Sequence, residues 1–202
     1  MATAALVLYL LGLAVVFGLR TWVQIRRTGS AGWNGVSGRP GSLRWFAGIL
    51  FIASLVLAVG ALALAATGIL TAPVTGPVGV AGLVVAVAGF VGVVLAQSGM
   101  GTSWRIGVAE SERTELVTGG VFAAVRNPIF SAMVAAQIGF AVLVPTWLSR
   151  LGLGSLIAAV QMQVRPIEEP HLVAVHGPAY LDYAARTGRF LPHLGRRART
   201  TT

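Results

Sequence analysis

The stretch from Glu115 to Phe130 reads ELVTGGVFAAVRNPIF, and it joins a glycine turn, an Arg-Asn-Pro step and a long apolar run. Glycines allow positive φ and let a ligand come close to the main chain. Pro128 lacks an N–H and disfavours helical geometry at the residue before it, so the sequence predicts a helix that begins at Pro128. A helix start beside Arg126 and Asn127 suits an anionic group such as a carboxylate. The same pattern also fits an ordinary interfacial turn with Arg126 facing lipid headgroups.

The composition around this stretch is that of a membrane protein. Of the 202 residues, 55% are hydrophobic and only 10% are charged, whereas a soluble domain carries roughly a quarter charged residues. No charged residue occurs in the ranges 1–19, 45–104 and 127–149. A membrane-spanning helix needs about 20 apolar residues, so the middle range is long enough for two. The sequence therefore predicts an all-α, polytopic membrane protein.

Five transmembrane segments are expected, at residues 2–19, 43–66, 78–97, 128–144 and 151–164. The last two are predicted to form a helical hairpin with a short second arm. Its 14 uncharged residues reach about 21 Å, less than a bilayer core of about 30 Å. Small residues four apart in the third segment, such as Gly82 and Ala86, favour close helix packing in lipid.

The segments divide the chain into three predicted parts. Residues 1–97 are expected to form three N-terminal helices, and residues 98–192 a catalytic region that ends in short cytoplasmic helices. Residues 193–202 are expected to form a disordered basic tail. Residues 20–44 and 98–126 are interpreted as loops because they are polar and rich in turn-forming residues.

The charges predict an orientation. With five spans, 14 of the 15 Arg and all six acids fall on one side, and the chain contains no Lys. The protein is expected to be integral to the cell (inner) membrane. The positive-inside rule then places its C-terminus in the cytoplasm and its N-terminus on the outer side of that membrane. The net charge of +9 is attributed to orientation and anionic lipid, and no nucleic-acid partner is expected. No Cys occurs and the three His are scattered, so no metal site is predicted.

A second informative stretch runs from Arg165 to Pro192. Arg165 lies three and four residues before Glu168 and Glu169, so the three side chains can share one face of a helical turn. Ionisable groups at the end of an apolar hairpin indicate a functional site, although an interfacial Arg–Glu pair gives the same pattern. A helix break at Gly177 precedes a short amphipathic helix that contains Tyr180, Asp182, Tyr183 and Arg186.

The two stretches together resemble the C-terminal half of the isoprenylcysteine carboxyl methyltransferase and phospholipid methyltransferase family of integral membrane enzymes. The first block of that family is similar to residues 116–132, and its Arg-x-x-Glu-Glu block is similar to residues 165–192, with a Trp-Arg step at residues 104–105. The resemblance covers residues 104–192. This chain departs from the family by carrying Asn127 in place of His, Phe122 and Phe130 in place of Tyr, and Ala132 in place of Gly.

The resemblance implies S-adenosyl-L-methionine bound at the cytoplasmic face and a lipophilic acceptor that enters from the bilayer. It implies a cofactor site formed by Val117, Thr118, Gly120, Phe122, Arg126, Asn127, Pro128, Glu168 and Glu169. A carboxylate acceptor would be positioned by Arg165 or, second, by Arg126. An amine or phenol acceptor would need a base, and Glu169 and His171 are the candidates. The expected catalytic residues are therefore Arg165, Glu169 and Arg126.

Two other functions fit parts of the sequence. An NADPH-dependent membrane reductase of the sterol-reductase type has similar Gly-x-Tyr and Arg-His-Pro features, but the Arg-x-x-Glu-Glu block fits the methyltransferases better. A non-catalytic transporter or assembly protein would give no reason for two polar blocks to meet on one side. Among acceptors, a prenylated protein, a phospholipid amine, a quinol-like ring and an isoprenoid acid stay open, and a small lipophilic molecule is favoured. The sequence leaves the oligomeric state open.

Overall fold

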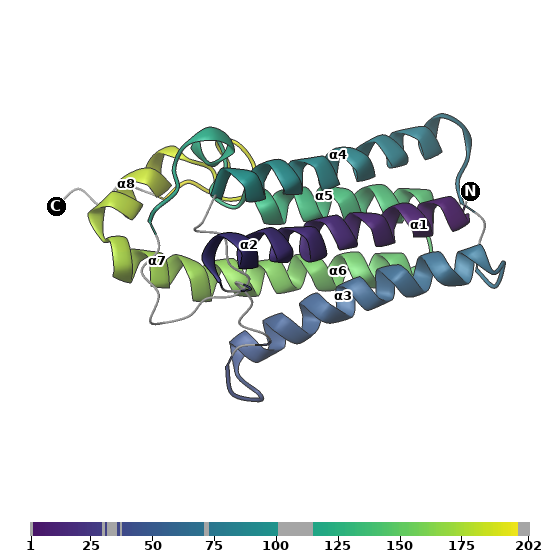
Figure 1. The fold of residues 1–202 in the computed structure, drawn as a ribbon, viewed down its shortest axis with the longest axis horizontal. Coiled ribbons are helices and arrows are strands. Elements are labelled where there is room, and N and C mark those ends of the chain that lie inside the picture. Colours follow the sequence, from purple (N-terminus) through teal and green to yellow (C-terminus); the bar gives the residue numbers. More distant parts are fainter. Residues whose placement is uncertain are drawn as a thin grey trace.

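The long helices of the protein lie side by side along one axis (Figure 1). The computed structural model describes residues 2–29, 31, 36, 38–70, 73–100 and 115–197. Within these residues the regular elements are all helical, and the only β contacts are two isolated bridges. The N-terminus lies at one end of the bundle, and α7 and α8 lie at the other (Figure 1). This confirms the predicted all-α fold class.

The first helix is longer than the sequence predicts. It comprises α1 (Ala2–Leu13), the π-helical turn η1 (Ala14–Leu19) and α2 (Arg20–Thr28), which together form one helix of 27 residues. The prediction of a loop from residue 20 is therefore wrong for residues 20–28. No Gly or Pro interrupts those residues, and the helix ends only at Gly29, whose φ of 73° is left-handed.

The next three helices confirm the predicted segments within a few residues. They are α3 (Leu43–Ala66), α4 (Gly76–Met100) and α5 (Pro128–Leu143). The side chain of Ser42 caps α3 by accepting a hydrogen bond from the Trp45 N–H. Helix α5 begins at Pro128, as predicted, and Asn127 has non-helical dihedral angles because the proline ring disfavours a helical residue before it.

The fifth segment is also longer than predicted. Helix α6 (Trp147–Gln163) continues through the π-helical turn η4 (Val164–Glu168) into α7 (Glu169–His176), and α8 (Pro178–Arg186) follows. The sequence predicted that this segment begins at residue 151, but the Thr146 hydroxyl accepts the Ser149 N–H at 3.1 Å and so starts the helix earlier. The break at Gly177 is confirmed, since its φ is 51°.

Three helices in the described residues are long and apolar enough to cross a membrane, namely Ala2–Thr28, Leu43–Ala66 and Gly76–Met100. Helix α5 is a shorter apolar helix, and it packs along α4 over most of its length. Helix α6 packs in the same way along α3. The protein is therefore an all-helical membrane protein, and the count of five spans stays a prediction.

The packing of α4 against α5 depends on glycine and alanine. A Cβ atom on Gly139 of α5 would lie 2.3 Å from the Ala86 nitrogen and 2.5 Å from the Gly82 carbonyl oxygen. A Cβ atom on Gly89 of α4 would lie 2.4 Å from the Ala136 nitrogen. Such close backbone approach gains dispersion energy in lipid, where no hydrophobic effect drives helices together. These contacts fix α5, and with it the start of the helix at Pro128.

We predict that Gly139→Ala lowers the stability of the bundle, whereas Gly154→Ala does not. The added methyl group at residue 139 must push two backbones apart, which costs about 1–3 kcal/mol, whereas a Cβ atom on Gly154 meets nothing within 4 Å. Thermal unfolding of the purified protein in detergent measures the difference. Equal unfolding midpoints for the two variants would contradict the packing described here.

Candidate functional site

The segment before α5 packs onto the C-terminal helices. Residues 115–118 are irregular, and Gly120–Ala123 form a single 3-10 turn, η3. The Phe122 side chain is buried and packs near Gly99 of α4. Its carbonyl oxygen accepts a 2.6 Å hydrogen bond from the Tyr183 hydroxyl of α8. The glycine turn at Gly119 and Gly120 is exposed, and no atom lies within 4 Å of a Cβ placed on either residue.

The start of α5 is covered by the segment that follows α8. The Arg126 N–H donates to the Gly188 carbonyl oxygen at 2.8 Å, and the Asn127 N–H donates to the Arg189 carbonyl oxygen at 3.1 Å. The Asn127 side chain donates a second hydrogen bond to the same oxygen at 3.1 Å. The main-chain N–H groups of Arg126 and Asn127, which lie beside the helix start that the sequence assigned to an anion, are therefore bonded within the protein.

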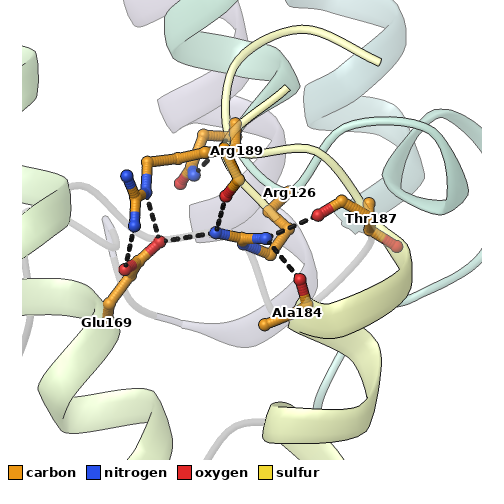
Figure 2. Close-up of polar contacts among 7 residues, drawn as sticks. Arg126, Glu169, Ala184, Thr187 and Arg189 are labelled. Carbon is orange, nitrogen blue, oxygen red and sulfur yellow. Dashed lines mark hydrogen bonds and ion pairs between the residues drawn. The ribbon is translucent and has the colours of Figure 1, made fainter. Parts of the chain in front are cut away.

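The Arg126 side chain is buried, with only 2% of its surface exposed. Figure 2 shows its guanidinium between Glu169 and the carbonyl oxygens of the C-terminal segment. It donates to Glu169 Oε1 at 2.9 Å and to the carbonyl oxygens of Ala184, Thr187 and Gly195 at 2.9, 2.5 and 3.1 Å. A buried guanidinium needs a counter-charge and acceptors for its donors, and both Nη atoms of Arg126 find them, whereas its buried Nε has no hydrogen-bond partner among the described residues.

The Glu169 carboxylate is shared by two arginines. Arg189 donates from Nε to Oε1 at 2.7 Å and from Nη2 to Oε2 at 2.9 Å, which is the bidentate geometry that guanidinium groups form with carboxylates. Burial alone would raise the pKa of Glu169, but the hydrogen bonds from Arg189 and Arg126 outweigh it and hold the pKa below its ordinary value. Glu169 is therefore ionised at neutral pH, and both of its oxygens are engaged.

The neighbouring Glu168 has a different environment. Its Oε1 atom accepts a 3.0 Å hydrogen bond from the Gln163 side chain, and no cation among the described residues pairs with it. Burial without a counter-charge raises the pKa of Glu168 to about 7, an effect that the Gln163 hydrogen bond opposes and the charge of Glu169 increases. The pKa values of the two adjacent carboxyl groups are thus shifted in opposite directions, because in the described residues only Glu169 has arginine partners.

Arg165 lies in the π-helical turn η4, which also contains Glu168 and ends directly before Glu169. Arg165 is exposed on this turn, whereas Glu169 is buried. The spacing of four residues suggested a shared face, but π-helical geometry places one residue more in the turn and changes which side chains align. Within the described part of the chain, Glu169 pairs with Arg126 and Arg189 rather than with Arg165.

The structure thus brings together two of the predicted site residues, Arg126 from the first block and Glu169 from the second. Thr118 and Gly120 lie on the surface, while Val117, Asn127 and Pro128 are half-buried. Their assignment to a cofactor site stays a prediction, as does that of Phe122 and Glu168. The Trp-Arg step at residues 104–105 lies outside the described residues.

The sequence interpretation missed Arg189 and Gln163. Arg189 lies between α8 and Leu191-Pro192, and none of the motif residues named above falls on it. Residues 193–197, assigned to a tail, also contribute, because the Gly195 carbonyl oxygen binds Arg126 and the Arg197 N–H donates to Ala184. One general signal in the sequence is the shortage of acids. With six acids and 15 arginines, a buried carboxylate is expected to pair with more than one arginine, and Arg189 was a candidate for the second.

A family model described as phospholipid methyltransferase matches residues 78–179, just over half of the chain. The match begins in α4 and ends at the start of α8, so it includes α5, α6, Arg126 and both glutamates. No curated protein and no solved structure matches the chain. The fold and the site together are those of a helical membrane protein with a polar site at one end of its bundle. The chain belongs to the phospholipid methyltransferase family. It is therefore a membrane methyltransferase of a family that acts on lipid.

We predict that Glu169→Gln destabilises the protein far more than Glu115→Gln. Removing the Glu169 charge leaves Arg126 buried without its ion-pair partner, and breaking a buried pair from one side costs about 3–5 kcal/mol. Glu115 is exposed, so its variant is a matched control. Thermal unfolding in detergent measures both, and a loss for Glu169→Gln no larger than that for Glu115→Gln would contradict the role given to the cluster.

Proposed function

We propose that this protein transfers a methyl group from S-adenosyl-L-methionine to a lipophilic acceptor at the cytoplasmic face of the cell membrane. The observation that carries the proposal is the 2.9 Å ion pair between Arg126 and Glu169. It joins the two polar blocks, which are 43 residues apart in sequence, within the region that matches the methyltransferase family. The orientation rests on the 14 of 15 arginines that the predicted spans place on one side.

The residues around the ion pair fit the chemistry of the cofactor. S-adenosyl-L-methionine carries an ammonium, a carboxylate and a sulfonium that supplies the methyl group. Glu168 has no cationic partner among the described residues, and burial raises its pKa to about 7, so a ligand ammonium would provide a counter-charge. Both oxygens of Glu169 are bound by arginines. We therefore assign the ammonium to Glu168 and the positioning of the surrounding segments to Glu169.

The carboxylate and adenosine of the cofactor are assigned to the segment before α5. Among the described residues, no atom lies within 4 Å of a Cβ on Gly119 or Gly120, so a ligand can reach the main chain there. Val117 and Thr118 precede this turn, and the buried Phe122 follows it. Asn127 and Pro128 hold the start of α5 in place, because the Asn127 side chain ties it to Arg189.

The remaining residues act on the acceptor. Arg165 is exposed where α6 leaves the apolar bundle, so it can bind the polar end of a lipid whose apolar part stays in the bilayer. For a carboxylate acceptor this cation suffices, because no proton needs to leave. For an amine or hydroxyl acceptor a base must take the proton, and His171 is the better candidate, because arginines bind both oxygens of Glu169 and hold its pKa below the ordinary value. Most of the rate enhancement would come from alignment and exclusion of water.

We predict that S-adenosylhomocysteine binds to the detergent-purified protein and that Glu168→Gln weakens this binding at least tenfold. Loss of one charge-assisted contact costs about 1.5–3 kcal/mol, and 1.4 kcal/mol corresponds to a factor of ten. Isothermal titration calorimetry measures the affinity, with Glu115→Gln as the matched control. Affinity should also increase as the pH rises through about 7, where Glu168 ionises, and Glu168→Gln should remove this pH dependence.

The outcomes of that titration separate the cofactor from its assigned contact. No binding by the folded wild-type protein would contradict the methyltransferase proposal itself. Binding that Glu168→Gln leaves unchanged would retain the cofactor and contradict only the role of Glu168. A parallel titration with NADPH should give no heat of binding.

A further inference from the structure

The segment after α8 ends in a tight turn that exposes apolar side chains. Residues Leu191 to Gly195, the C-terminal turn, are closed by a bridge between Leu191 and Leu194 and by a hydrogen bond from the Leu194 N–H to the Leu191 carbonyl oxygen at 3.2 Å. His193, at the tip, has a φ of 67°. Leu191 and Leu194 expose 57% and 61% of their surface, so both apolar side chains of this turn are open to the surroundings.

This turn is attached at the edge of the apolar bundle. The Ser131 hydroxyl, in the first turn of α5, donates to the Phe190 carbonyl oxygen at 2.6 Å. The Phe190 side chain packs against the buried cluster of Leu156, Val160 and Val164 at the end of α6. In Figure 1 the segment after α8 lies beside the ends of α4 and α5, between the bundle and α8. The turn therefore starts next to the first turn of α5 and the apolar residues of α6.

The charges next to the turn have one sign. Arg196 and Arg197 follow it directly and are exposed, and no acid occurs in the sequence after Asp182. Exposed leucines followed by arginines form the pattern by which a segment lies in the interface of an anionic membrane, with its apolar side chains in the boundary layer and its cations among the headgroups.

We propose that the C-terminal turn inserts Leu191 and Leu194 into the interfacial layer of the membrane that the protein spans, and that Arg196 and Arg197 bind anionic lipid headgroups there. The position of Phe190 in the bundle fixes the depth, and the charge of the two arginines selects the lipid. The turn also supplies the Gly195 carbonyl oxygen that binds Arg126. Contact with the lipid surface thus holds the segment that surrounds the Arg126–Glu169 pair.

Spin labelling tests this proposal cleanly, because the chain contains no cysteine. Single-cysteine variants Leu194→Cys and Leu191→Cys are labelled with a nitroxide and placed in nanodiscs of phosphatidylcholine mixed with phosphatidylglycerol. Asp182→Cys on α8 is the exposed aqueous control, and Val84→Cys, 60% exposed on α4, is the lipid control. We expect labels at residues 191 and 194 to be relaxed by oxygen and to lose relaxation by a water-soluble nickel chelate, as at residue 84.

A second comparison tests whether Arg196 and Arg197 bind anionic headgroups. The Arg196→Gln/Arg197→Gln double variant should regain nickel relaxation at residue 194 in the anionic nanodiscs, and nanodiscs of phosphatidylcholine alone should have the same effect on the parent chain. A label at residue 194 that the nickel chelate reaches as readily as at residue 182 would overturn the insertion of the turn. Labels that behave alike in both lipids and in both chains would overturn the binding of anionic headgroups.

Discussion

The fold of the C-terminal third depends on the need to satisfy one buried cation. The guanidinium of Arg126 lies at the end of an apolar bundle, where a charge without partners would cost several kcal/mol. Glu169 supplies the counter-charge, and three main-chain carbonyl oxygens accept hydrogen bonds from the two Nη atoms. These carbonyls belong to the end of α8 and the segment after it, so that segment must fold around the arginine. The site is thus held by contacts between residues far apart in sequence.

This arrangement separates the roles of the two adjacent glutamates. Glu169 is ionised and shared by two arginines, whereas Glu168 has one amide donor and a raised pKa. The boundary between the π-helical turn η4 and α7 falls between them, because Glu168 ends η4 and Glu169 begins α7. A carboxylate that already has its cations holds a structure together, and one that lacks a cation is available to a ligand. We therefore regard Glu168 as the binding residue and Glu169 as its support.

Local sequence signals predicted those parts of the fold that depend on local chemistry. The start of α5 at Pro128, the break at Gly177 and the apolar helices follow from backbone restrictions and from long uncharged runs. Signals at helix ends were less decisive. The arginines of residues 20–28 suggested a loop, although no Gly or Pro there interrupts a helix. The capping role of Thr146, which directly follows Pro145, was not predicted. The contact of Glu169 with Arg189 could not be predicted from spacing, because it joins a helix to a segment 20 residues later.

A structure of the protein with S-adenosylhomocysteine bound tests the roles of Glu168 and Glu169 most directly. We predict that the ligand's ammonium contacts the Glu168 carboxylate and that its carboxylate lies against the main chain at Gly119 and Gly120. Glu169 should keep its hydrogen bonds to Arg126 and Arg189 in the complex. A complex in which Glu169 leaves these arginines to bind the ligand, while Glu168 stays with Gln163 alone, would contradict the division of roles on which the account rests.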